Sequence, residues 1–402
     1  MASTTTATAA LAAKVKAVSV DVLARNIGRG DVVKATWLAL LTGRPAFFLG
    51  SPGVNKTGTV EALAGRVDGA VFFEALMPVI ASSEQLLVES TSIEEMPAAN
   101  GGKSIRTRDE LGRAAKAHLV FADEIWKADP RVLQTLLDLS KGDGVRHEGS
   151  MVKTPLMAFL AASNELPEEE GNLAALWSRM TIRVVVNPLD RGGKLALAKA
   201  RLAGQKSGVG GNAVSSAKLS LDEVRQLRAA RNTVIVPDSI VELVLEIYQQ
   251  LLDKEDGDFD WLWADDRRFG RVLDVLQANA LLDGRNTVTK QDLAVLEWLL
   301  WNDPEQIGTV KAVLAPYCRT PLDDARELVD ALLAPGGTVA EVRGGARGKG
   351  VQALTQVEET CKALEALKAN AGPLAGDVDA LLRQTVAVKQ EVINVITGAV
   401  RR

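Results

Sequence analysis

Residues that bind metals or form disulfides are scarce in this sequence. Its 402 residues include only two cysteines, Cys318 and Cys361, and two histidines, His118 and His147. The cysteines lie far apart without metal-ligand spacing, which argues against a zinc cluster and a disulfide-rich scaffold. Two reduced thiols are typical of a cytoplasmic protein, and we expect this location.

Long apolar runs and an excess of one charge are also absent. No window approaches about 18 uninterrupted apolar residues, so we expect no membrane span. A formal net charge of -4 gives no reason to expect a nucleic-acid partner. With 47% hydrophobic and 24% charged residues, the sequence is that of a globular protein with two or three domains. The Ala/Thr-rich start lacks a signal-peptide pattern and predicts a disordered leader over residues 1–14.

What is present is a candidate phosphate-binding loop. The segment Phe47 to Thr57 reads F-F-L-G-S-P-G-V-N-K-T, a strand, a tight turn and a helix start. It matches G-x-x-x-x-G-K-[ST] except that Asn55 replaces the last glycine, and asparagine tolerates positive φ. Lys56 would reach the β- and γ-phosphates of a nucleotide, and the Thr57 hydroxyl would bind Mg²⁺. The alternative is an ordinary strand–turn–helix connection. The candidate nucleotide-binding residues are Gly50, Pro52, Gly53, Val54, Asn55, Lys56, Thr57 and Gly58.

Polar residues follow two later apolar runs. Asp123 and Glu124 come directly after the run His118–Ala122, where a buried strand is expected. Asp123 would hold Mg²⁺ through its water shell, while Glu124 would polarise the water that attacks the γ-phosphate. Asn164 follows the next run and would hold that water or a γ-phosphate oxygen, unless it is only a turn-forming residue.

Runs of strand and helix pattern alternate through the first half of the chain. This alternation predicts an α/β fold with a parallel sheet and ligands at the carboxyl ends of its strands. The β signal fades after Asn187, and the rest has helical spacing. A Gly-rich stretch, Pro335 to Gly350, predicts a flexible linker. The expected parts are an α/β nucleotide-binding domain at 15–205, an all-helical lid domain at 206–302, a helical extension and linker at 303–350, and a C-terminal helical hairpin at 351–402.

Two stretches of the α/β domain depart from this alternation. Residues 84–115 are irregular and indicate an insertion with an exposed loop at Asn100-Gly101-Gly102-Lys103. Residues 141–153 predict a β-hairpin, with Arg146 and His147 as candidate contact residues at its tip. A plain solvated loop is the alternative there.

Taken together, these motifs resemble those of MoxR-type AAA+ ATPases, closest to the RavA branch. The resemblance covers roughly residues 15–300. Its carrying stretches are G-S-P-G-V-N-K-T at 50–57, L-V-F-A-D-E-I-W-K-A at 119–128, A-A-S-N-E-L-P at 161–167, A-L-W-S-R-M-T-I-R at 175–183 and D-D-R-R-F at 265–269.

The resemblance implies a role for each matching position. Lys56 and Thr57 correspond to Walker A, Asp123 and Glu124 to Walker B, and Asn164 to sensor 1. Arg179 corresponds to an arginine finger, with Arg183 as the competing candidate, and Ser178 stands where the family has an acid. Arg267 corresponds to a sensor 2 arginine that would join the lid to the same phosphates, with Arg268 as its competitor. Ile27 and Gly28 match the segment that lines the adenine pocket.

The same resemblance implies ATP and Mg²⁺ as cofactors and assembly into a ring of identical subunits, usually a hexamer. It also implies a partner with a von Willebrand A-type domain and a chaperone-like role in maturing protein complexes. A nucleotide-gated scaffold with little hydrolysis is the alternative, because Asn55 and Ser178 depart from the family pattern. A nucleic-acid motor would share the insertion, but the acidic net charge disfavours it.

Overall fold

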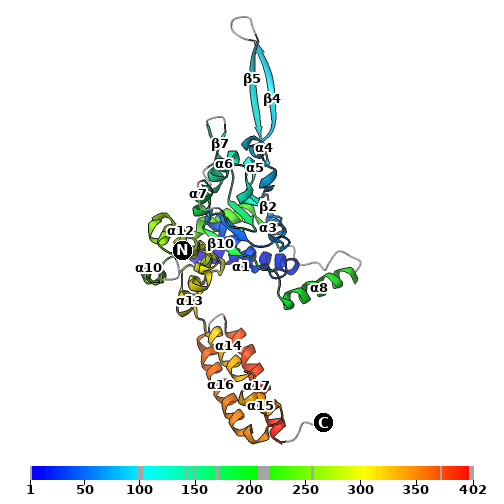
Figure 1. Cartoon of the computed structure of the whole chain (residues 1–402), viewed down its shortest axis with the longest axis vertical. Helices are drawn as coiled ribbons and strands as arrows, with labels where there is room; N and C mark the ends of the chain where they lie inside the picture. The colour runs from blue at the N-terminus through cyan, green and yellow to red at the C-terminus, as the bar shows by residue number, and fades with distance from the viewer. Residues whose placement is uncertain are drawn as a thin grey trace. The chain divides into compact units, whose positions relative to one another are not determined.

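The computed structural model describes residues 2–97, 103–141, 144–147, 150–167, 172–206, 217–254, 258–371 and 374–397. The chain folds into two compact units, Met1–Leu314 and Ala315–Arg402 (Figure 1). The first unit holds every candidate site residue, and the second is helical.

A five-stranded parallel sheet forms the centre of the first unit. Its strands are β1 (Ala46–Leu49), β3 (Phe72–Leu76), β6 (Leu119–Asp123), β9 (Ala158–Ser163) and β10 (Ile182–Val185). The spatial order is β10-β1-β9-β6-β3, and all neighbours run parallel. The predicted α/β fold with a parallel sheet is confirmed. The carboxyl ends of β1, β6 and β9 therefore meet at one edge of the sheet.

Helices cover both faces of the sheet, which explains why its central strands read as continuous apolar runs. Phe47 points to one face, where its ring lies 5.2 Å from Trp126 and 5.3 Å from Trp177, while Phe48 stacks on Phe121 at 6.4 Å. The helices of this part of the unit are α1 (Ala2–Arg25), α2 (Gly30–Thr42), α3 (Lys56–Ala64), η1 (Met77–Val79), η2 (Ile125–Lys127), α6 (Pro130–Lys141) and α7 (Asn172–Arg179).

The irregular insertion is a long antiparallel ribbon. After α4 (Ser83–Leu87), β4 (Val88–Pro97) pairs with β5 (Lys103–Leu111), and α5 (Arg113–Lys116) leads back to the sheet. Figure 1 shows this ribbon extending well beyond the sheet. The loop at 98–102 lies outside the described residues. The second predicted hairpin is confirmed as β7 (Val145–His147) and β8 (Ser150–Val152), and the side chains of Arg146 and His147 lie outside the described part.

Helices make up the rest of the first unit. Beyond α8 (Arg191–Lys206), the short parallel pair β2 (Val67–Asp68) and β11 (Leu219–Ser220) joins the α/β part to the lid. The lid contains α9 (Leu221–Arg231), α10 (Asp238–Leu252), α11 (Trp261–Ala264), α12 (Asp266–Leu282), η3 (Lys290–Trp298) and α13 (Gln306–Cys318). Helix α9 begins at a capping box between Ser220 and Glu223, and α2 packs against α9 and α12.

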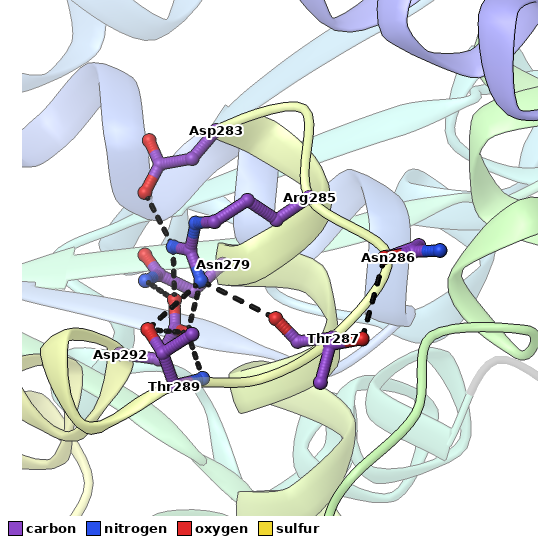
Figure 2. Close-up of polar contacts among 7 residues, drawn as sticks. All are labelled: Asn279, Asp283, Arg285, Asn286, Thr287, Thr289 and Asp292. Carbon is purple, nitrogen blue, oxygen red and sulfur yellow. Dashed lines mark hydrogen bonds and ion pairs between the residues drawn. The ribbon is translucent and has the colours of Figure 1, made fainter. Parts of the chain in front are cut away.

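A buried polar network holds the turn between α12 and η3 (Figure 2). The Asp292 side chain is fully buried and accepts hydrogen bonds from Arg285 at 2.5 and 2.7 Å, from Asn279 at 2.6 Å and from the Thr289 backbone at 2.8 Å. Arg285 also pairs with Asp283 at 2.8 Å, at a more exposed position. These charge-assisted bonds raise the pKa of Arg285 above its ordinary value.

We expect Asp292→Ala to lower the free energy of unfolding by about 3–5 kcal/mol, because it leaves the Arg285 charge without its buried partner. Asp283→Ala is the matched control: it removes the exposed partner of the same guanidinium, and its effect is expected to stay within about 1 kcal/mol. Denaturant titration of both variants measures this difference. Equal effects would show that the buried pair contributes no more than the exposed one.

Two sequence predictions about irregular segments are wrong. The predicted disordered leader at 1–14 belongs to helix α1, which begins at Ala2. The predicted linker, Pro335 to Gly350, contains α15 (Thr338–Arg343) and η4 (Arg347–Lys349). Val339 and Val342 of α15 are buried in the core of the second unit, so this Gly-rich stretch is an integral part of a folded unit.

The second unit is an all-helical bundle. Its long helices are α14 (Pro321–Leu332), α16 (Gly350–Asn370) and α17 (Ala375–Thr397). Helices α16 and α17 are the predicted C-terminal hairpin, and α14 and α15 pack against both of them. Among the described residues, no helix has the length and hydropathy that crossing a membrane requires.

Candidate nucleotide-binding site

The loop between β1 and α3 has the backbone of a phosphate-binding loop. Gly53 has φ +83°, and a Cβ there would meet no atom within 4 Å, so the loop is open on this side. Gly50 is a different case, because a Cβ would lie 2.4 Å from the Val186 carbonyl oxygen. The Gly50 backbone N–H donates to the Ser163 carbonyl at 3.0 Å. The loop is thereby fixed to the end of β9.

Asn55 adopts the left-handed conformation, with φ 61° and ψ 41°, which asparagine tolerates better than most residues. Its side-chain amide donates to the Asn26 Oδ1 at 2.8 Å. A Cβ at Gly58 would lie 2.4 Å from the Asn55 Oδ1, so Gly58 leaves the space in which the Asn55 amide lies. The departure from the usual glycine is therefore accommodated by three residues together.

We expect Asn55→Ala to destabilise the protein by about 1–2 kcal/mol and to weaken ATP binding, because alanine resists positive φ. Asn55→Gly keeps the backbone conformation and loses only one hydrogen bond, so its binding should stay near that of the wild type. Denaturant titration and a fluorescent-nucleotide titration of both variants test this order. If the glycine variant binds worse than the alanine variant, the amide and not the backbone conformation dominates.

Lys56 lies at the first helical position after the loop. Its Nζ donates to the carbonyl oxygens of Gly50 at 2.6 Å and Ser51 at 3.3 Å. Partial burial lowers the pKa of Lys56, and the nearby charges of Asp123 and Glu124 oppose this shift. The ammonium group and the two carboxylates thus share one electrostatic environment.

Asp123 ends β6, and Glu124 turns the chain with φ 53° and ψ 44°, in the left-handed region. A non-glycine residue rarely adopts this conformation, and strain of this kind is concentrated at functional sites. The Glu124 backbone N–H donates to Asp123 Oδ1 at 3.0 Å. The Glu124 carboxylate accepts a hydrogen bond from Lys127 Nζ at 2.7 Å, and Glu165 lies 3.8 Å from the same ammonium.

Asn164 directly follows β9 and is exposed. In the sheet register, Asp123 lies opposite Ala162 and Leu49 lies opposite Ser163. The phosphate loop, the acidic pair and Asn164 consequently meet at the carboxyl ends of three adjacent strands.

The segment predicted to line an adenine pocket lies beside the phosphate loop. Gly28 has φ +69°, and a Cβ there would lie 2.4 Å from Leu189. The Arg29 guanidinium donates to the Gly28 carbonyl at 2.8 Å and to the Asn187 carbonyl at 3.1 Å. The buried Asn26, next to Ile27, holds the Asn55 side chain. The structure thus brings Ile27 and Gly28 to the loop, through an asparagine that the sequence analysis did not single out.

These residues fit a magnesium nucleotide. The Thr57 hydroxyl and the Asp123 carboxylate are hard oxygen ligands of the kind that Mg²⁺ prefers, and Mg²⁺ in nucleotide sites takes its other ligands from phosphate and water. No set of three or more His, Cys, Asp or Glu residues in the described ranges could hold a metal ion by itself. The protein therefore offers an open half-site that suits a phosphate-bound ion.

Four arginines gather at the opposite edge of the sheet. Arg44 lies two residues before β1. Arg179 ends α7 just before β10, where the Thr181 and Ile182 N–H groups donate to the Pro45 carbonyl. A pocket is lined by Arg44, Arg267, Gly270, Arg271 and Asp274. The pKa of Arg271 is lowered first by burial; the charge of Asp265 opposes this shift, and those of Arg44, Arg179 and Arg267 add to it.

The structure does not bring one predicted site residue to the phosphate loop. Arg267 was expected to join the lid to the phosphates bound beside Lys56. Instead it shares a pocket with Arg44, at the amino end of β1, whereas Lys56 follows the carboxyl end. The four residues of β1 separate the two edges by about 13 Å. The structure therefore groups Arg267 with Arg179 and not with the phosphate loop.

The two competing arginines are buried. Arg183 and Arg268 are each 1% exposed. The Arg183 guanidinium lies 4.0 Å from the Trp177 ring and donates to the carbonyls of Met180, Trp177 and Trp301, and burial lowers its pKa. Arg268 lies over the Trp261 ring at 4.5 Å and donates to the Leu299 carbonyl. Both side chains are committed to the packing of the lid and core.

Comparisons with known proteins agree with this geometry. The family model described as the MoxR domain in the MoxR–vWA–β-propeller ternary systems matches residues 13–229. A model of an AAA lid domain matches residues 239–314. The predicted family and fold are both confirmed by these matches.

Similar proteins include two uncharacterized proteins of Methanocaldococcus jannaschii. One is 25% identical over 71% of this chain and 70% of its own length, the other 24% identical over 70% of each. A structural protein of Acidianus two-tailed virus is 29% identical over 39% of this chain and 25% of that protein. A crystal structure of a candidate ATPase from Cytophaga hutchinsonii superposes with a TM-score of 0.57 at 17% identity, covering 77% of this chain and 95% of that one. This last likeness is one of fold.

Proposed function

Because the chain belongs to the MoxR family of AAA+ ATPases, we propose that it is a Mg²⁺-dependent ATPase of the RavA-like branch that works as a ring of identical subunits. The single observation that carries this proposal is the separation of the phosphate loop from the arginine cluster. Lys56 and the acidic pair occupy the carboxyl edge of the sheet, and Arg179 and Arg267 occupy the amino edge. Arginines placed there would reach a nucleotide only when it is bound to a neighbouring subunit.

Each site residue then has a distinct task. The loop N–H groups and Lys56 bind the phosphates, and Thr57 and Asp123 hold the ion that neutralises their charge. Glu124 accepts a proton from the attacking water, and Asn164 orients that water. The neighbour's Arg179 and Arg267 would neutralise the charge that develops on the γ-phosphate.

The proposed work of the ring is to remodel a partner protein in a chaperone-like role. The matched family is described from systems that pair the MoxR domain with a vWA protein, which supports a von Willebrand A-type partner. The ribbon of β4 and β5 and the hairpin of β7 and β8 are candidate contact elements. Both rise from the α/β part of the first unit, and the ribbon extends well beyond the sheet (Figure 1).

A nucleotide-gated scaffold is the second candidate. One observation favours it: the carboxylate of Glu124 is engaged by Lys127 at 2.7 Å. A carboxylate oxygen that accepts a hydrogen bond from an ammonium group is occupied and must be released before it can accept a proton from water. In this reading, ATP binding assembles the ring and turnover is slow until a partner displaces Lys127.

The test is ATP turnover measured against protein concentration, with particle mass followed in parallel. The proposal predicts that specific activity rises steeply over the concentrations at which the ring forms. A ring that assembles with ATP but hydrolyses little would favour the scaffold. Full activity in a monomer would contradict the proposed arginines in trans.

A further inference from the structure

Helix α8 has almost no contact with its own subunit. From Arg191 to Leu202 every residue except Gly193 is exposed, and Leu195, Leu197 and Leu202 are 56%, 42% and 58% exposed. Isolated helices of this length are marginal in water, and packing of an apolar face supplies most helical stability in proteins. A helix with three uncovered leucines therefore needs a surface that lies outside the subunit.

The charges on α8 indicate what kind of surface this is. The helix carries Arg191, Lys194, Lys199, Arg201 and Lys206 and no acidic residue. None of the first four side chains forms an ion pair within the described ranges. Lys194 and Arg201 are seven residues apart and lie on the same side of the helix. The complementary surface should be acidic, with apolar side chains beside the acids.

Helix α10 of the lid presents such a surface. Asp238, Glu242 and Glu246 are exposed and lie in a row at i, i+4 and i+8. Leu245 is 37% exposed beside this row. The opposite side of α10 is buried in the lid core through Ile240, Val244, Ile247 and Leu251. The acidic face of α10 thus complements α8 in charge and offers it an apolar contact.

Helices α8 and α10 lie on opposite sides of the first unit, as Figure 1 shows, so they do not pair within one subunit. One helix lies near the nucleotide side of the subunit and the other near its arginine side. Helix α8 begins two residues after Leu189, which contacts Gly28 beside the phosphate loop. Helix α10 packs on α12, the helix of Arg267, through Tyr248 and Phe269, whose rings lie 5.8 Å apart.

We propose that α8 of one subunit docks on the acidic face of α10 of the next subunit in the ring. This contact joins the nucleotide side of one subunit to the arginine side of its neighbour. It is heterologous, so repeating it generates a ring or an open helix rather than a closed dimer. The proposal rests on the ring assembly proposed above and names the surfaces that build it.

Charge reversal in the full-length protein tests this contact. Two single-face variants are Lys194→Glu/Arg201→Glu on α8 and Asp238→Lys/Glu242→Lys on α10, and a third protein carries all four changes. Particle mass is measured against protein concentration with a non-hydrolysable ATP analogue. Each single-face variant is expected to assemble at least about 10-fold more weakly. The protein with all four substitutions should recover most of that loss, because the complementarity of charge is restored. Arg326→Glu/Lys362→Glu on the second unit, where both side chains are exposed, is the matched control and should assemble like the wild type.

The outcomes distinguish an error in the α8–α10 contact from an error in the ring assembly. If the wild type forms a ring and both single-face variants form it equally well, the α8–α10 contact is wrong and the ring stands. Weak assembly of the α8 variant without recovery in the protein with all four substitutions would place a different surface opposite α8. Binding of anionic phosphatidylserine vesicles that depends on Lys194 and Arg201, with assembly unchanged, would assign the helix to a membrane surface. A wild type that stays monomeric with the analogue would overturn the ring itself. Circular dichroism confirms that every variant is folded.

Discussion

Glu124→Gln is expected to lower ATP turnover by about 10²–10⁴-fold, the usual contribution of a general base, while ATP binding is retained. The substitution keeps the size of the side chain and its position after β6, but a neutral amide cannot accept the proton of the attacking water. The variant should therefore accumulate as an ATP-bound ring. Single-turnover kinetics and a nucleotide titration measure the two effects separately.

Glu165→Gln is the matched control for this prediction. Glu165 is also an acid within reach of the Lys127 ammonium, at 3.8 Å, but it lies beyond Asn164 and its side chain is 51% exposed. Its replacement should leave turnover within about 2-fold, because an exposed ion pair of this kind contributes little. If Glu124→Gln hydrolyses ATP normally, another residue activates the water and the assignment of Glu124 fails.

The sequence is sufficient to predict the sheet because its strands are buried on both faces. A run such as Leu156 to Ala162 has no other stable place in a folded protein, so its apolar pattern alone identifies it. The β4–β5 ribbon could not be predicted in this way. Its strands are polar and their stability comes from pairing with each other, which a pattern of apolar residues does not record.

The prediction of a linker in the Gly-rich stretch before α16 was wrong for a related reason. Val339 and Val342 are the only residues of α15 that are buried, and two valines in six residues are too few to give a periodic signal. Burial by the neighbouring helices α16 and α17 makes this segment helical. Composition indicated a linker because glycine lowers local helix propensity, and tertiary packing overrides that propensity here.

The site also contains residues that the sequence locates and residues that only the fold reveals. Lys56 and Asp123 are fixed by motifs whose spacing reflects a local strand-to-helix turn, so the sequence locates them. The motif does not separate Arg179 from Arg183, and only the fold shows that Arg183 is buried and stacked on Trp177. Arg44 and Arg271 belong to no motif, because the amino edge of the sheet is assembled from segments far apart in the chain. The contact of Lys127 with Glu124 could have been predicted from the sequence, because the two residues have i, i+3 spacing.

Arg179→Ala is expected to lower ATP turnover by about 10³-fold or more, in the range found for arginine fingers, with ATP affinity and the unfolding midpoint little changed. The side chain is half-buried, and its single described hydrogen bond joins it to the Ala175 carbonyl at 2.7 Å. Arg183→Ala should behave in the opposite manner and lower the unfolding midpoint, because it leaves several buried carbonyls without a donor. Thermal unfolding and turnover of both variants separate the two arginines. Normal turnover in Arg179→Ala would remove it from the site.

Mixing inactive variants shows whether Arg179 acts on a neighbour's nucleotide. Lys56→Ala subunits cannot bind nucleotide but still carry Arg179, and Arg179→Ala subunits bind nucleotide but lack the finger. In a random 1:1 mixture, about a quarter of the interfaces pair an intact Lys56 with a neighbour's intact Arg179, so activity should return although each protein alone is inactive. If the rings mix by mass and no activity returns, Arg179 does not complete its neighbour's site. Recovery of turnover would place the finger in trans and would make hydrolysis a property of the assembled ring.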